Sequence, residues 1–150
     1  METITKINND DDYFLAVGRV LYFSQCIEHD LKLTYFLLNP NIDFNNIEKL
    51  TLGATVKKLK EKDSSSKHPF LGTEDYDLLD QITKIRNKYA HECFIEWVYE
   101  SKDRINKAFT KSANRLINDH NRLAKLYKVI EKVRIDLAKE QDVESIYLKS

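Results

Sequence analysis

The chain has 150 residues, of which 42% are hydrophobic and 32% are charged, and its 24 basic side chains balance its 24 acidic ones. This composition is typical of a soluble globular protein and excludes a disordered chain. No apolar run approaches the roughly 20 residues that a membrane-spanning helix needs, and the polar, acidic start of the chain is unlike a secretory signal. We therefore expect a single domain over residues 1–150, located in the cytoplasm, without a membrane partner.

The two cysteines, Cys26 and Cys93, show neither CxxC spacing nor the Cys and His spacing of a zinc site. They are interpreted as reduced thiols in a reducing compartment. Asp77 and Asp80 lie three residues apart, but two carboxylates alone make a poor two-metal site. The sequence therefore predicts neither a metal nor a cofactor.

Helices are expected throughout, because the 78 residues after Gly72 contain neither glycine nor proline. The first predicted helix covers residues 11–38, with acidic side chains at its positive end and a stop at Asn39 and Pro40. A periodic apolar stripe defines its core side. The stripe consists of Val17, Val20, Leu21, Ile27, Leu31, Tyr35 and Leu38.

Three more helices are predicted in chain order. A short one follows Thr51 as its N-cap, the next begins at Thr73, and the last runs from near Ser101 to about Gln141. Their apolar positions recur at helical spacing. These positions are Leu52, Val56 and Leu59 in the short helix, Leu78, Ile82, Ile85 and Tyr89 in the next, and Phe109, Ala113, Leu116, Leu123, Tyr127, Ile130 and Leu137 in the last.

The segment 93–99 stays open between an extension of the third predicted helix and a short extended connection, since periodicity does not decide. Short connections between helices favour antiparallel neighbours. The predicted fold is therefore all-α, an antiparallel bundle of four to five helices, and its long amphipathic helices favour a dimer.

Charge is distributed unevenly along the chain. Residues 1–48 hold three basic and eight acidic side chains, whereas residues 102–139 hold eleven basic and four acidic ones. Such asymmetry favours a polyanion partner for the C-terminal half, although a solvated helix face gives the same pattern. The RNA-binding residues predicted here are Lys107, Lys111, Arg115 and Lys125, with Lys84 and Lys88 on the preceding helix.

The segment Ile85-Arg-Asn-Lys-Tyr-Ala-His-Glu92 carries the most informative pattern. At about 100° per residue, Asp80, Lys84, Asn87 and His91 share the face opposite the core stripe. Arg86 lies at the flank of this face. A guanidinium binds phosphate with two hydrogen bonds, and an imidazole transfers protons near neutral pH. This face is therefore predicted to bind a phosphate and to act on it.

The Arg-x4-His spacing, the Asn after the Arg and the sequence RNKYAH at a helix end resemble the HEPN superfamily. The resemblance implies a four- or five-helix bundle that dimerises so that two motifs face each other. Many members are metal-independent endoribonucleases, often toxins or abortive-infection (phage-defence) effectors, and others bind RNA, a nucleotide or a protein partner without cleavage. Arg86, Asn87 and His91 are then the catalytic residues, and an antitoxin is one conceivable partner.

The sequence departs from the family pattern at one position. Members controlled by a nucleotidyltransferase antitoxin often carry a tyrosine two residues after the His, and this chain has Cys93 there. That mode of control is therefore in doubt, although Tyr89 and Tyr99 lie nearby.

A second Arg-x4-His match, Arg115 to His120, is rejected. Leu116 follows the arginine in place of a polar residue, and His120 falls on the predicted core seam, where a satisfied core histidine is the better interpretation. Three readings of the first match stay open: a homodimeric ribonuclease, a binding module that does not cleave, and a structural helical adaptor in which Arg86 and His91 only cap the helix.

Overall fold

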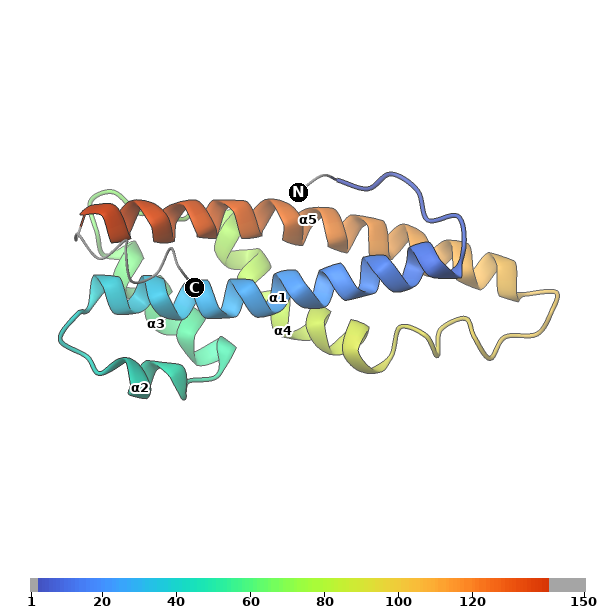
Figure 1. The fold of residues 1–150 in the computed structure, drawn as a ribbon, viewed down its shortest axis with the longest axis horizontal. Coiled ribbons are helices and arrows are strands. Elements are labelled where there is room, and N and C mark those ends of the chain that lie inside the picture. The colour runs from blue at the N-terminus through green and yellow to red at the C-terminus, as the bar shows by residue number, and fades with distance from the viewer. Residues whose placement is uncertain (1–2, 141–150) are drawn as a thin grey trace. The chain divides into compact units, whose positions relative to one another are not determined.

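The computed structural model describes residues 3–140, which form five helices: α1 (Asp10–Leu38), α2 (Phe44–Glu48), α3 (Leu52–Ser64), α4 (Thr73–His91) and α5 (Ile105–Glu140) (Figure 1). No strand occurs within these residues, so the all-α prediction is confirmed. The chain divides into two compact units. Within the described residues, unit 1 comprises residues 3–25 and Ile82–Lys125, and unit 2 comprises Cys26–Gln81 and residues 126–140.

Helices α1, α4 and α5 each contribute residues to both units. The described helices include none that is both long and apolar enough to traverse a bilayer.

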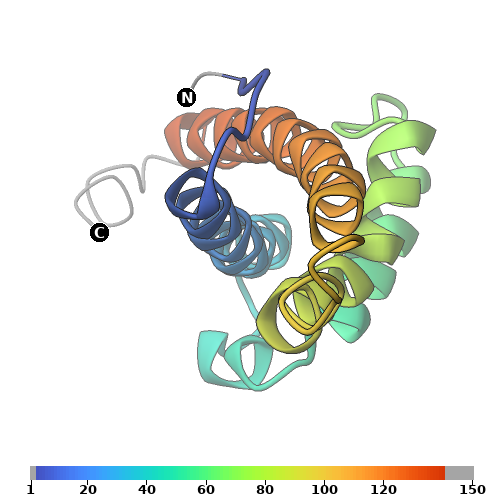
Figure 2. The same ribbon diagram turned by 90° about the vertical axis from the view of Figure 1, so that its right-hand side faces the viewer.

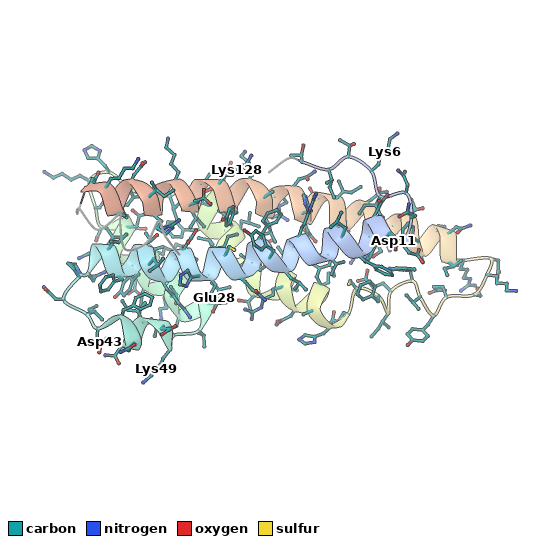
Figure 3. The ribbon with its side chains drawn as sticks, in the orientation of Figure 1. Lys6, Asp11, Glu28, Asp43, Lys49 and Lys128 are labelled. Carbon is teal, nitrogen blue, oxygen red and sulfur yellow. The ribbon has the colours of Figure 1, made fainter. Side chains whose placement is uncertain are left out.

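Helix α1 begins at Asp10 because Asn9 caps it. The Asn9 side chain accepts the N–H of Asp12 at 2.8 Å, and the Asp12 carboxylate accepts the N–H of Asn8 at 3.0 Å. These bonds satisfy N–H groups around the first turn, where a helix lacks internal acceptors. Asp11 lies in the same turn (Figure 3), where the helix dipole favours a carboxylate.

Unit 1 has an apolar core built from α1, α4 and α5. Its fully buried side chains include Val20, Phe23, Ile82, Leu116 and Leu123. Residues 92–104, which we call the turn segment, connect α4 to α5 (Figure 2). An aromatic cluster that includes Trp97 borders the core there. The Trp97 ring lies 5.2 Å from the Tyr13 ring and 4.9 Å from the Phe109 ring, centroid to centroid. Trp97 is therefore a core residue and is buried away from solvent.

The segment that precedes α1 is attached to α5 by Asn121. The amide oxygen of Asn121 accepts the N–H of Ile4 at 2.9 Å, and its amide nitrogen donates to the Ile4 carbonyl at 2.8 Å. These two bonds fix the orientation of the Asn121 amide, because its oxygen faces a donor and its nitrogen faces an acceptor.

In unit 2, capping side chains begin the two short helices. Asp43 accepts the N–H of Asn45 at the start of α2 (Figure 3), and Thr51 accepts the N–H of Ala54 at the start of α3. The predicted Thr51 cap is thus confirmed. The buried apolar side chains of this unit include Ile27, Leu31, Leu37, Ile47, Leu59, Leu79 and Ile130.

The predicted helices are confirmed with three corrections. Helix α2 was not predicted, the last helix begins at Ile105 and not near Ser101, and the segment 93–99 forms turns, neither continuing α4 nor extending. The predicted end near Gln141 lies outside the described residues. The predicted core positions are buried or half-buried, and Leu21, Ile85 and Tyr127 are among the half-buried ones.

Candidate functional site

The predicted site residues Arg86, Asn87 and His91 lie in the last turns of α4, in unit 1. The helix ends at His91 because the chain turns back there, and the N–H of Cys93 donates to the Lys88 carbonyl at 2.9 Å. Lys88 and His91 occupy the last turn, where the helix dipole favours positive charge.

Tyr89 fixes which side of α4 faces the core. Its side chain is buried, and its hydroxyl donates to the Asp119 carboxylate of α5 at 2.5 Å. Asp119 also lies 3.6 Å from the Arg122 guanidinium. Burial and the hydrogen bond to Asp119 raise the pKa of Tyr89, so the phenol keeps its proton. With Tyr89 directed inward, helical geometry directs residues 87 and 91 to the opposite side.

Solvent exposure agrees with this rotation. Lys84, Asn87 and His91 are exposed, whereas Arg86 and Lys88 are half-buried at the flanks. The predicted polar face opposite the core stripe is thus confirmed as an exposed face. Asn87 and His91 are four residues apart and therefore neighbours on the helix surface. Within the described residues the His91 imidazole has no hydrogen bond or ion pair.

A partly buried polar network holds the turn segment that follows His91. Glu96 forms two hydrogen bonds with the Arg115 guanidinium, at 3.1 and 3.3 Å, and accepts the Ser112 hydroxyl at 3.1 Å. The Tyr13 hydroxyl lies 2.7 Å from the Ser112 hydroxyl, at hydrogen-bond distance, and 3.4 Å from the Cys93 carbonyl, which accepts from it. Burial raises the pKa of Tyr13 to about 12, so this phenol stays protonated. These bonds join the turn segment to α1 and α5.

Cys93 is buried within the same region. Its thiol donates to the Tyr89 carbonyl at 3.6 Å, and burial raises its pKa. A protonated, buried thiol is a poor nucleophile and is inaccessible to a modifying enzyme. Tyr99, by contrast, is 83% exposed.

The second Arg-x4-His pair cannot form an exposed phosphate site. The Arg115 guanidinium is bound to Glu96, and His120 is fully buried against the Phe23 ring, with 5.3 Å between ring centroids. His120 Nδ1 lies 2.9 Å from the Asn121 amide oxygen, so Nδ1 carries the proton. The prediction of a core histidine is confirmed. It is only half satisfied, however, because Nε2 has no hydrogen-bond partner among the described residues.

The part of α5 that belongs to unit 1 presents a basic stripe. Lys107, Lys111 and Lys125 are exposed and lie within about 40° of one another around the helix. The exposed charged side chains from Arg104 to Lys125 are all positive, since the one carboxylate there, Asp119, is buried. Arg115, which was predicted with this group, is half-buried and neutralised by Glu96.

Sequence reasoning missed the two carboxylates that organise this region, Glu96 and Asp119. A buried tyrosine needs a partner for its hydroxyl, and this rule applied to Tyr89 could have directed attention to Asp119 beside the core seam. Glu96 gave no comparable signal, because its segment has no periodicity. Among the described residues, no group of three His, Cys, Asp or Glu side chains is arranged to hold a metal ion.

Comparison with known proteins adds no relative: no protein-family model, no curated protein and no solved structure matches this chain.

Proposed function

We propose that this chain is a metal-independent endoribonuclease that acts as a homodimer and cleaves RNA with Arg86, Asn87 and His91. The observation that carries the proposal is the exposed placement of Asn87 and His91, as neighbours, at the end of a helix whose rotation is fixed by Tyr89 and Asp119. Both side chains are accessible to a phosphate from solvent.

The proposed reaction uses the nucleophile that RNA itself provides. His91 of one copy accepts the proton of a 2′-OH while that oxygen bonds to the adjacent phosphorus. The bond from phosphorus to the 5′-oxygen breaks, and His91 of the second copy donates a proton to the leaving oxygen. The products are a 2′,3′-cyclic phosphate and a free 5′-OH.

Arg86 and Asn87 complete the proposed site. The Arg86 guanidinium stabilises the negative charge that develops on the phosphoryl oxygens, and two parallel hydrogen bonds suit this task. On RNA binding, the Asn87 amide positions either the phosphate or the neighbouring imidazole of His91. The basic stripe of α5 adds attraction for the RNA backbone, through Lys107, Lys111 and Lys125.

Cleavage of a defined RNA in EDTA, with identification of the product ends, tests the proposal. We expect cyclic-phosphate and 5′-OH ends, and we expect His91→Ala to reduce the rate by at least about 10²–10⁴-fold. His68→Ala is the matched control, because His68 is also exposed but lies in a loop of unit 2. Equal rates for His91→Ala and His68→Ala would eliminate the proposed chemistry.

A second candidate function is RNA binding without cleavage. It is favoured by the lack of an orienting partner for the His91 imidazole within the described residues, since catalytic bases are commonly held by a third group. An intact protein that binds RNA, with an affinity lowered by Arg86→Ala, but leaves it uncut would establish this alternative.

A further inference from the structure

Exposed apolar side chains gather in unit 1. Of the nine large hydrophobic residues that are exposed in the described chain, seven belong to this unit. Three come from α1 and four from the turn segment after His91. We call them the α1–turn surface; they are Phe14, Leu15, Tyr22, Phe94, Ile95, Val98 and Tyr99, exposed by 37–83%.

The two groups meet at Phe14 and Phe94. The Phe14 ring lies 5.5 Å from the Phe94 ring, centroid to centroid, so α1 and the turn segment meet through apolar contact. On α1, residues 14, 15, 18 and 22 lie within about 100° of one another around the helix. Glu96 of the turn segment bonds to Arg115 of α5. The middle of the turn segment is therefore held on α5, and Phe94 lies three residues after His91 in the chain.

Its area fits a protein interface. If a whole large side chain presents about 200 Å², the exposed fractions of these seven amount to roughly 750 Å². The largest apolar patch of an ordinary monomer measures about 300–600 Å², whereas a stable complex buries about 800 Å² on each partner. The polar face of Lys84, Asn87 and His91 cannot supply such a core, because interface cores are depleted of charge.

No contact within the protomer requires a glycine at position 18. A glycine inside a helix is unfavourable relative to alanine, yet a Cβ added at Gly18 would meet nothing within 4 Å. Gly18 lies in the middle of the exposed face of α1, four residues from both Phe14 and Tyr22. A glycine at this position would let a second polypeptide pack closely against α1. The aromatic rings of Phe14 and Tyr22 would then lie on either side of that contact.

We propose that the α1–turn surface is the contact between two copies of this chain, with α1 crossing α1 at Gly18. A two-fold axis at Gly18 places Phe14 of one copy against Tyr22 of the other, so the same patch is complementary to itself. The polar face with His91 then lies at the edge of the interface and not in its core. The role of this dimer in cleavage rests on the proposed function, whereas the contact rests on the apolar surface.

The substitution Gly18→Ala tests whether the exposed face of α1 is buried in a dimer or stays in solvent. In the protomer, alanine has room and favours the helix, so the unfolding midpoint measured under monomeric conditions should rise by about 1–4 °C. In the dimer the added methyl obstructs the crossing, and the dimer Kd, measured by analytical ultracentrifugation, should rise about 5- to 150-fold. Gly53→Ala is the matched control, because Gly53 is also helical and open but lies in unit 2; it should leave the Kd unchanged.

Leu15→Glu provides a second test, with Ile42→Glu, an exposed apolar residue of unit 2, as its control. We expect Leu15→Glu to give a folded monomer and Ile42→Glu to remain dimeric. A wild-type protein that is monomeric at high micromolar concentration overturns the contact. So does a dimer that tolerates both Gly18→Ala and Leu15→Glu, and so does a loss of RNA binding in Leu15→Glu without any change of oligomeric state.

Cleavage assays on the same variants distinguish a failure of the proposed contact from a failure of the proposed ribonuclease function. A Leu15→Glu monomer that still cleaves RNA supports the contact and contradicts the composite site. A wild-type dimer that is disrupted by Leu15→Glu but never cleaves RNA supports the contact and contradicts the proposed function.

Discussion

Two histidines of this chain follow an arginine at the same spacing, but their surroundings give them different chemistry. His91 is exposed at the end of α4, whereas His120 is completely buried on α5. Burial, with the Arg19 charge as a smaller contribution, lowers the pKa of His120 below its ordinary value of 6.5, against the opposing effect of the Asn121 hydrogen bond. The buried ring is therefore neutral, with its proton on Nδ1.

This neutrality predicts a pH dependence of stability. The folded state resists protonation of His120, whereas the unfolded chain takes up a proton below about pH 6.5, so the free energy of unfolding falls as the pH falls. From pH 7.5 to 5.5 the contribution of His120 should decrease by up to about 1.4 kcal/mol. Denaturant titrations at the two pH values measure this loss.

His120→Gln removes the titrating group, so its stability should decrease less over the same pH interval than that of the wild type. His68→Gln replaces an exposed histidine and should follow the wild type. Identical pH profiles for the wild type and His120→Gln would show that His120 does not govern this dependence.

At the scale of the helix, a buried hydrogen bond supports the rotation of α4. Ile82 and Tyr89 are buried, the Tyr89 hydroxyl donates to Asp119, and Asn87 and His91 lie in solvent. Tyr89→Phe removes the hydroxyl and leaves the buried carboxylate with the more distant Arg122. The free energy of unfolding should fall by about 1–3 kcal/mol, as expected when a buried acceptor loses its donor.

Chemical denaturation checks this value, with Tyr99→Phe as the control because Tyr99 is 83% exposed. If the two variants were equally stable, the hydrogen bond to Asp119 would contribute nothing measurable to the packing of α4 on α5.

The helices were predictable from sequence because periodicity and end signals act locally. The Thr51 cap and the stop after Leu38 are properties of a few neighbouring residues, and so is the polar face that includes Asn87 and His91. The turn segment was not predictable, because it is held by bonds from Glu96 to Arg115, nineteen positions along the chain. Local sequence patterns do not predict contacts between residues so far apart in the chain.

At the scale of the whole molecule, a net charge of zero conceals a basic stripe on α5. Replacing Lys107, Lys111 and Lys125 together by glutamate should weaken RNA binding and flatten its salt dependence. Each lost phosphate contact lowers the slope of log K against log salt by about 0.7–0.9. Fluorescence anisotropy at several salt concentrations measures both effects.

A matched variant carries the same charge change on α3, at the exposed Lys57, Lys58 and Lys62 of unit 2. It should keep the slope of the wild type. If both triple variants weakened binding equally, the effect would reflect net charge and not the stripe on α5.

The attachment of the N-terminal segment has a consequence for how this chain can vary. The Asn121 side chain bonds only to the main chain of residue 4, to the N–H and the carbonyl of that residue. A neighbouring β-strand forms the same pair of bonds. The side chain at that position is not part of the recognition, so any residue that keeps its N–H can form both bonds. Proline alone is excluded. Position 121, by contrast, needs a donor and an acceptor on one short, flat group, which asparagine supplies.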